Sequence, residues 1–163
     1  MSAVARAQEV HERSVAREIV LAGAAAGLLG GAAMMLFLCL SFLGHHMELR
    51  EPVVAVAALF MGPRALVAGP GAVLAGVAIH AVVSAAIGIA FAAIVPRFVG
   101  AGPALAYGLA ASGVVMLVMT FAVLPWADPT LVARAAFFPV TWIFVHALFG
   151  VGLAFVPAFR RHL

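Results

Sequence analysis

The chain has 163 residues, of which 66% are hydrophobic and only 9% are charged, and its mean hydropathy is +1.21. This composition excludes a soluble globular domain and predicts an integral membrane protein. The net charge of +3 comes from nine arginines set against six acids, and because these arginines are scattered at the ends of apolar segments, we expect no nucleic-acid partner.

Four apolar stretches are long enough to cross a bilayer, which requires about 20 residues in a helix. They cover residues 19–43, 72–95, 104–124 and 135–156. The polar segment 1–18 resembles the start of a signal peptide, but the apolar run after it is too long for a cleaved one. We therefore predict an all-α integral membrane protein, a bundle of four transmembrane helices that forms a single membrane domain over residues 1–163.

Two short segments between the spans follow an acid-proline pair. An acid and a proline favour the start of a helix, because the acid complements the helix dipole and proline fits the first turn. Residues 52–61 follow Glu51 and residues 129–138 follow Asp128, and both segments are too short to span. We predict short helices at the outer membrane interface, with Trp126, and as a second candidate Trp142, anchored among the headgroups.

The distribution of arginine predicts the orientation. Six arginines flank the side that includes both termini and three flank the other: Arg6, Arg13, Arg17, Arg97, Arg160 and Arg161 against Arg50, Arg64 and Arg134. Cytoplasmic flanks carry the excess of positive charge, so both termini should be cytoplasmic. The layout resembles that of small bacterial four-span proteins, and we expect a multi-pass protein of the bacterial inner membrane.

The two halves of the chain have similar sequences. Glycine and methionine recur in the same order in the segments that begin at Gly27 and at Gly108, and the segments that begin at His80 and His146 share small residues and a final Ala-Phe. Together with the acid-proline pairs, these similarities predict two tandem helical-hairpin repeats.

Each predicted span carries small residues at intervals of four. Such stripes let helix backbones approach closely, and in lipid they indicate where helices contact each other. We predict packing at Gly23, Gly27 and Gly31 of the first span, Gly76, Ser84 and Gly88 of the second, Gly108 and Ser112 of the third, and Gly150 of the fourth.

His80 and His146 are the candidate cofactor ligands. An ionisable side chain inside a membrane is a functional hypothesis by default, and two imidazoles at similar depth suit the axial ligation of haem b. The alternative is that each ring only forms an interhelical hydrogen bond. Copper is a weaker alternative, because thioethers and imidazoles are ligands that suit Cu(I). Met34 and Met35 of the first span and Met116 and Met119 of the third lie near the level of the histidines, and we take Met35 and Met116 as the first candidates.

The sequence leaves three classes of function open. The predicted spans contain no charged residue, which argues against a charged ion pathway, and no known catalytic motif is present, so we do not expect an enzyme. The leading hypothesis is a non-catalytic accessory or structural subunit of a larger membrane complex, for example a respiratory one, whose partners are the lipid bilayer and other subunits or further copies. The alternatives are a haem b or copper protein for electron transfer or metal handling, and a small oligomeric channel or carrier for a neutral solute.

Overall fold

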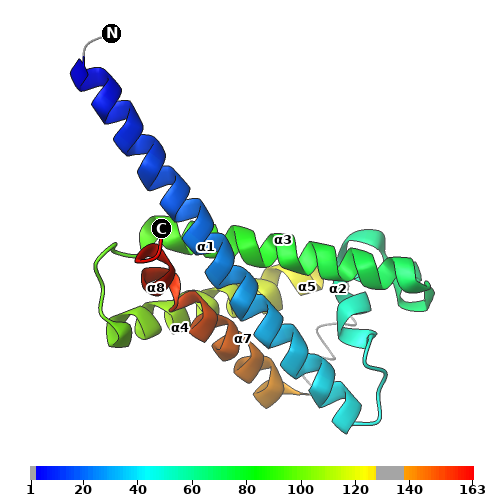
Figure 1. Ribbon diagram of the computed structural model, residues 1–163. Coiled ribbons are helices and arrows are strands. Elements are labelled where there is room, and N and C mark those ends of the chain that lie inside the picture. The colour runs from blue at the N-terminus through cyan, green and yellow to red at the C-terminus, as the bar shows by residue number, and fades with distance from the viewer. Residues whose placement is uncertain (1–2, 128–137) are drawn as a thin grey trace.

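The computed structural model describes residues 3–127 and 138–163, and every regular element within these ranges is helical (Figure 1). The elements are α1 (Ala3–Gly44), α2 (Glu51–Met61), the 3₁₀ helix η1 (Pro63–Val67), α3 (Pro70–Ile94), α4 (Ala101–Val118), the π-helix η2 (Met119–Val123), α5 (Leu124–Ala127), α7 (Pro139–Leu153) and α8 (Val156–Arg160).

Four helical stretches are long and apolar enough to cross a membrane, as predicted. They are His11–Gly44, Pro70–Ile94, Ala101–Ala127 and Pro139–Arg160. The chain is therefore an all-α protein with four candidate membrane spans, which implies contact with a lipid bilayer. Of the two predicted interfacial segments, residues 52–61 lie in the apolar helix α2, whereas residues 129–137 lie outside the described residues, together with Arg134 and the first three residues of the fourth predicted span.

Prolines set several of the helix boundaries. Pro52, Pro70 and Pro139 each occupy one of the first two positions of a helix, α2, α3 and α7 respectively. Amides there have no intrahelical partner, so a missing N–H costs nothing. At the other end of α3, Val95 takes an extended conformation before Pro96, because the proline ring disfavours a helical conformation at the preceding residue.

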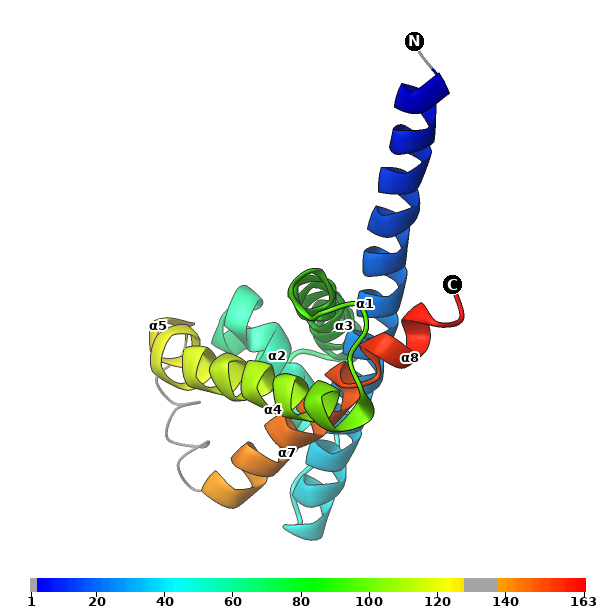
Figure 2. The same ribbon diagram turned by 90° about the vertical axis from the view of Figure 1, so that its left-hand side faces the viewer.

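The helices pack in the order α3, α1, α7, α4. Helix α1 crosses both α3 and α7, α4 crosses α7, and α2 packs against α3 (Figures 1 and 2). Within the described residues α3 and α4 have no extensive contact. The contacts between the four candidate spans therefore form a series of helix pairs, and the amino-terminal part of α1 extends well beyond the other helices (Figure 2).

The main apolar core lies where α1, α3, α7 and α8 meet. Its buried side chains are Ala26, Phe91, Ala92, Val95, Phe149, Leu153 and Val156. A second, smaller core joins α2 to η1 and the start of α3 through Val54, Ala57, Ala58, Ala65 and Ala72. Helix α2, which was expected at the membrane interface, therefore packs one of its faces against η1 and the start of α3.

A charged cluster closes the end of the molecule near the carboxyl terminus. Arg97 donates to one oxygen of Glu18, and Arg160 Nε lies 3.5 Å from the other. The remaining nitrogens of Arg160 donate to the carbonyls of Ala92 and Val95, the latter at 3.2 Å. The side chains of Glu18 and Arg160 are only 10% and 7% exposed, whereas that of Arg97 is half-exposed. This cluster ties α1 to α8 and to the segment after α3.

Candidate functional site

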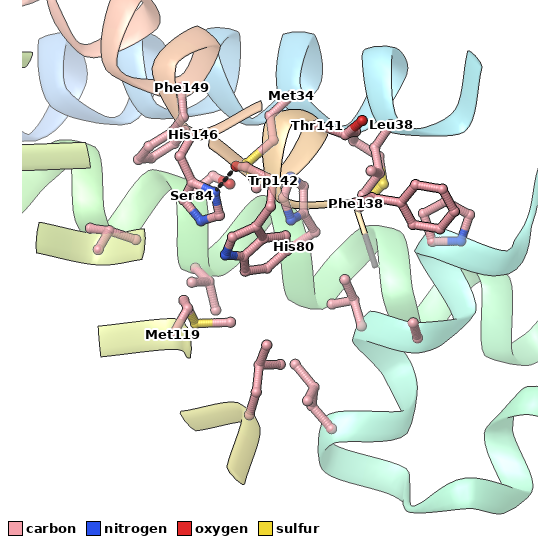
Figure 3. Close-up of a pocket in the computed structure, with 18 of the residues that line it drawn as sticks. Met34, Leu38, His80, Ser84, Met119, Phe138, Thr141, Trp142, His146 and Phe149 are labelled. Carbon is pink, nitrogen blue, oxygen red and sulfur yellow. Dashed lines mark hydrogen bonds between the residues drawn. The ribbon is translucent and has the colours of Figure 1, made fainter. Parts of the chain in front are cut away.

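A cavity of about 200 Å³ lies between the helices at the end opposite the charged cluster (Figure 3). Its walls are almost entirely apolar and come from α1, α2, α3, α4, η2, α5 and α7, with Phe138 preceding α7. The lining residues are Met34, Met35, Leu38, Phe42, Glu51, Pro52, Ala55, Val56, Leu59, His80, Val83, Ser84, Ile87, Val115, Met119, Leu124, Phe138, Thr141, Trp142, His146 and Phe149. Both candidate histidines therefore reach one site.

His80 projects from α3 and is half-buried. Its Nε2 lies 3.0 Å from the carbonyl oxygen of Gly31 on α1. A carbonyl accepts only, so Nε2 carries the proton of this bond. Gly31 permits the approach, because a Cβ at that position would overlap the side chain of Ser84 on α3. The imidazole thus joins α1 to α3 while lining the cavity.

His146 projects from α7 and is 3% exposed. Its Nδ1 donates to the carbonyl oxygen of Trp142, one turn earlier, at 2.8 Å. The indole of Trp142 meets the imidazole edge-on, with 4.5 Å between ring centroids (Figure 3). The backbone carbonyl of His146 accepts a hydrogen bond from Ser112 of α4. The bond to Trp142 within α7 fixes the orientation of the imidazole ring, and the bond from Ser112 of α4 holds the backbone of His146.

Trp142 is held in turn by α4 and η2. Its Nε1 donates to Oγ1 of Thr120 at 2.9 Å, and Thr120 donates to the carbonyl of Met116 at 2.7 Å. A buried indole N–H normally needs such a partner. The chain of bonds from Met116 to Trp142 therefore orients the aromatic wall of the cavity.

The wide turn at η2 was not predicted from the sequence. Over Met119–Val123 the helix is of π type, and the amide of Leu124 bonds to the carbonyl of Met119. Pro125, which follows, has no N–H, so the α-helical pattern of backbone hydrogen bonds is interrupted there. π-turns inside helices frequently occur at functional sites. Pro125 within an apolar run was the sequence signal for this irregularity.

The predicted packing glycines lie at close helix crossings. A Cβ built on Gly23 would be 2.6 Å from the carbonyl oxygen of Gly88, and one on Gly27 would overlap the carbonyl of Ser84, so both face α3. Gly108 and Gly150 approach each other between α4 and α7, where a Cβ on Gly150 would be 2.8 Å from the carbonyl oxygen of Gly108. These distances explain why larger side chains do not fit.

Other packing residues lie differently from the prediction or were missed. Gly76 contacts the backbone of Val53 on α2, a short helix, rather than a membrane-spanning one. Gly30 and Gly152 approach each other between α1 and α7 and were not predicted, although both are glycines inside apolar runs. The stripe at intervals of four thus identified one face of α1 and overlooked the second.

The cavity does not bring the two methionines of the copper hypothesis together. Met35 lines it, whereas Met116 is not among its lining residues; the sulfur-bearing side chains of Met34 and Met119 line it instead (Figure 3). Nor do residues 3–127 and 138–163 contain any cluster of three or more His, Cys, Asp or Glu side chains able to hold a metal.

The cavity by itself does not support the haem hypothesis. Nε2 of His80 is bound to the carbonyl of Gly31 and Nδ1 of His146 to that of Trp142, so an axial ligand would have to be Nδ1 of His80 or Nε2 of His146. A porphyrin with four pyrrole rings is several times larger than benzene, for which roughly 150 Å³ suffices, and the cavity measures about 200 Å³. Haem ligation therefore stays a prediction from the sequence.

Comparison of the chain with protein-family models, with curated proteins and with solved structures found no match. The function is therefore argued from the geometry of the cavity alone.

Proposed function

We propose that this protein binds a small, largely apolar molecule in the cavity lined by His80 and His146, as a binding protein or carrier for such a solute. The observation that carries the proposal is the cavity itself, whose volume is about 200 Å³ and whose apolar walls hold a few oriented polar groups. Small-molecule sites commonly have this composition, because apolar walls supply affinity and polar groups fix orientation.

The size of the cavity indicates which part of a ligand it can hold. An enclosed apolar cavity of roughly 150 Å³ binds benzene. A volume near 200 Å³ therefore accommodates a six-membered ring with a short substituent, and because the cavity is partly open, a longer ligand can extend out of it. Trp142, Phe138 and Phe149 give such a ring aromatic surface to contact.

The tandem-repeat hypothesis belongs to the same proposal. Gly27 of α1 packs on Ser84, four residues after His80, and Gly108 of α4 packs on Gly150, four residues after His146. The next residues at the same interval contact the same two histidines in different ways: the carbonyl of Gly31 accepts from the imidazole of His80, and the hydroxyl of Ser112 donates to the backbone carbonyl of His146. The equivalent positions of these contacts support two related hairpins, α1 with α3 and α4 with α7, which each contribute one imidazole to a shared site.

The remaining hypotheses rest on the sequence. Exposed apolar side chains such as Leu36, Phe121 and Ile94 are expected against lipid as well as against another subunit, so they do not favour an accessory role over solute binding. The inner-membrane location with cytoplasmic termini remains a prediction from the arginine distribution.

The test is direct binding to the purified protein in lipid nanodiscs. Trp126 is exposed, so Trp126→Phe leaves Trp142 in the cavity wall as the single tryptophan reporter. We expect cyclohexanol to shift the emission of Trp142 in a saturable manner. A shift that only grows in proportion to the probe concentration in the lipid would contradict a cavity site.

A pair of substitutions separates the cavity from the lipid. Ala55→Phe fills the cavity from α2 and should abolish the saturable signal. Ala32→Phe adds the same ring at an exposed position of α1 that does not line the cavity and should leave the signal intact. Equal behaviour of the two variants would refute the proposed site.

A further inference from the structure

We infer that the ligand of this cavity donates a hydrogen bond, and thus that the preferred solute is a hydroxyl-bearing apolar molecule such as an alcohol or a phenol. The inference rests on the proposed function and specifies the chemistry of the same site. It follows from the protonation pattern that the hydrogen bonds impose on the two imidazoles.

The bond from His146 to Trp142 fixes the tautomer of the first ring. A carbonyl oxygen can only accept, so Nδ1 of His146 must carry a proton to bond at 2.8 Å. The ring is neutral, because an isolated charge inside a bilayer is costly. Its Nε2 is consequently an unprotonated acceptor, and no group in the described ranges donates to it.

His80 has the opposite tautomer and the same consequence. Its Nε2 is the donor to the carbonyl of Gly31 at 3.0 Å, so Nδ1 is the acceptor. Nothing described in residues 3–127 and 138–163 donates to that nitrogen either. Two helices from different halves of the chain therefore present one imidazole acceptor each at one cavity.

The fixed donors beside the cavity that belong to the described part of the chain are already used. The indole N–H of Trp142 bonds to Thr120, and the hydroxyl of Thr120 bonds to the carbonyl of Met116. Glu51 contributes a carboxylate oxygen that accepts from the amide of Glu48 at 3.3 Å. The hydroxyls of Ser84 and Thr141 can rotate, so each can donate to a ligand or accept from it.

The two unpaired acceptor nitrogens at the cavity discriminate between ligands that donate a hydrogen bond and ligands that do not. A hydroxyl placed against either imidazole satisfies a buried acceptor, whereas an ether of similar shape brings a lone pair toward a lone pair. Leaving a buried acceptor unpaired costs about as much as a lost hydrogen bond. We therefore expect an alcohol to bind about tenfold more tightly than its methyl ether, after correction for partition into lipid.

The experiment compares cyclohexanol, methoxycyclohexane and methylcyclohexane on the Trp126→Phe protein in nanodiscs, with affinities expressed per concentration in the lipid. Tighter binding of the alcohol supports the inference. Saturable binding of all three probes with equal affinity overturns the inference but leaves the proposed function standing. No saturable binding of any probe overturns both.

A substitution and a spectrum test the assigned nitrogens. His146→Gln replaces the acceptor Nε2 by an amide that also donates, so it should bring the alcohol and the ether close to equal affinity, while His11→Gln on the exposed part of α1 should keep the tenfold preference. In the unsubstituted chain, ¹⁵N spectra of the imidazoles should show Nδ1 protonated in His146 and Nε2 protonated in His80. The reverse pattern, or doubly protonated rings, would overturn the inference even if His146→Gln fails to fold.

Discussion

The two ends of this helical assembly accommodate polar side chains within an apolar protein in opposite ways. At the charged end, Arg97 and Arg160 both pair with Glu18, and Arg160 also donates to backbone carbonyls. At the cavity end, His80 and His146 each use one nitrogen to bind the protein, and the other nitrogen has no partner among residues 3–127 and 138–163. Paired groups stabilise a fold, whereas unused acceptors at the wall of a cavity are suited to a ligand.

The glycines explain why the helices are close at one end and apart at the other. From Gly23 to Gly31 helix α1 has no side chains that would hold α3 or α7 away, and the backbones approach closely. From Met34 to Phe42 its side chains are large, and several of them line the cavity. The size of side chains along one helix thus sets where the assembly is packed and where it is open.

The largest effect is expected at the closest crossing. Gly27→Leu would drive a side chain into the backbone of Ser84, and overpacking of this kind should cost about 3 kcal/mol of unfolding free energy or more. A Cβ built on Gly113 of α4 would meet no atom within 4 Å, so Gly113→Leu is the matched control and should be tolerated. Yield of monodisperse protein and unfolding in SDS would measure both, and equal stability of the two variants would contradict the packing argument.

The next largest loss of unfolding free energy is expected in the charged cluster. Glu18→Gln leaves Arg160 buried without its counter-charge, and breaking a buried pair from one side should cost about 3 kcal/mol. Glu9→Gln removes a solvent-exposed pair with Arg13 and should cost less than about 1 kcal/mol. Saturable binding of cyclohexanol should persist in both variants. If Glu18→Gln abolished binding without loss of stability, the two ends would not be independent.

The smallest loss of unfolding free energy is expected for the hydrogen bond that supports the cavity wall. Thr120→Val removes the acceptor for the indole of Trp142, and an interhelical hydrogen bond in a membrane protein contributes about 0.6 kcal/mol. A double-mutant cycle with Trp142→Phe, followed by unfolding, should recover a coupling of that size, and the cyclohexanol affinity, read from the emission of Trp142, should weaken in Thr120→Val. Ser41→Ala, which loses only a bond to Phe37 within α1, is the control. A coupling of zero would show that the two side chains do not act together.

The sequence was informative about the site only in part. It singled out both histidines because ionisable groups are rare inside apolar spans, and the structure places both at one cavity. It could not indicate which nitrogen of each ring is occupied, because the partners Gly31 and Trp142 offer backbone carbonyls that any residue would offer. Nor could it indicate which of the four candidate methionines line the cavity, because counting residues estimates depth in the membrane, whereas the direction that a side chain faces depends on the rotation of its helix.

By itself the sequence determined the helical class and the four candidate spans, because hydropathy acts locally and is independent of the packing partner. Only the tertiary structure decided that α1 contacts α3 and α7 through two different glycine faces, that α4 reaches the assembly through α7, and that Glu18 meets Arg160. In lipid the apolar surfaces of all helices are alike, so composition cannot say which pairs form. Shape complementarity at glycines and a few directional polar contacts make that choice.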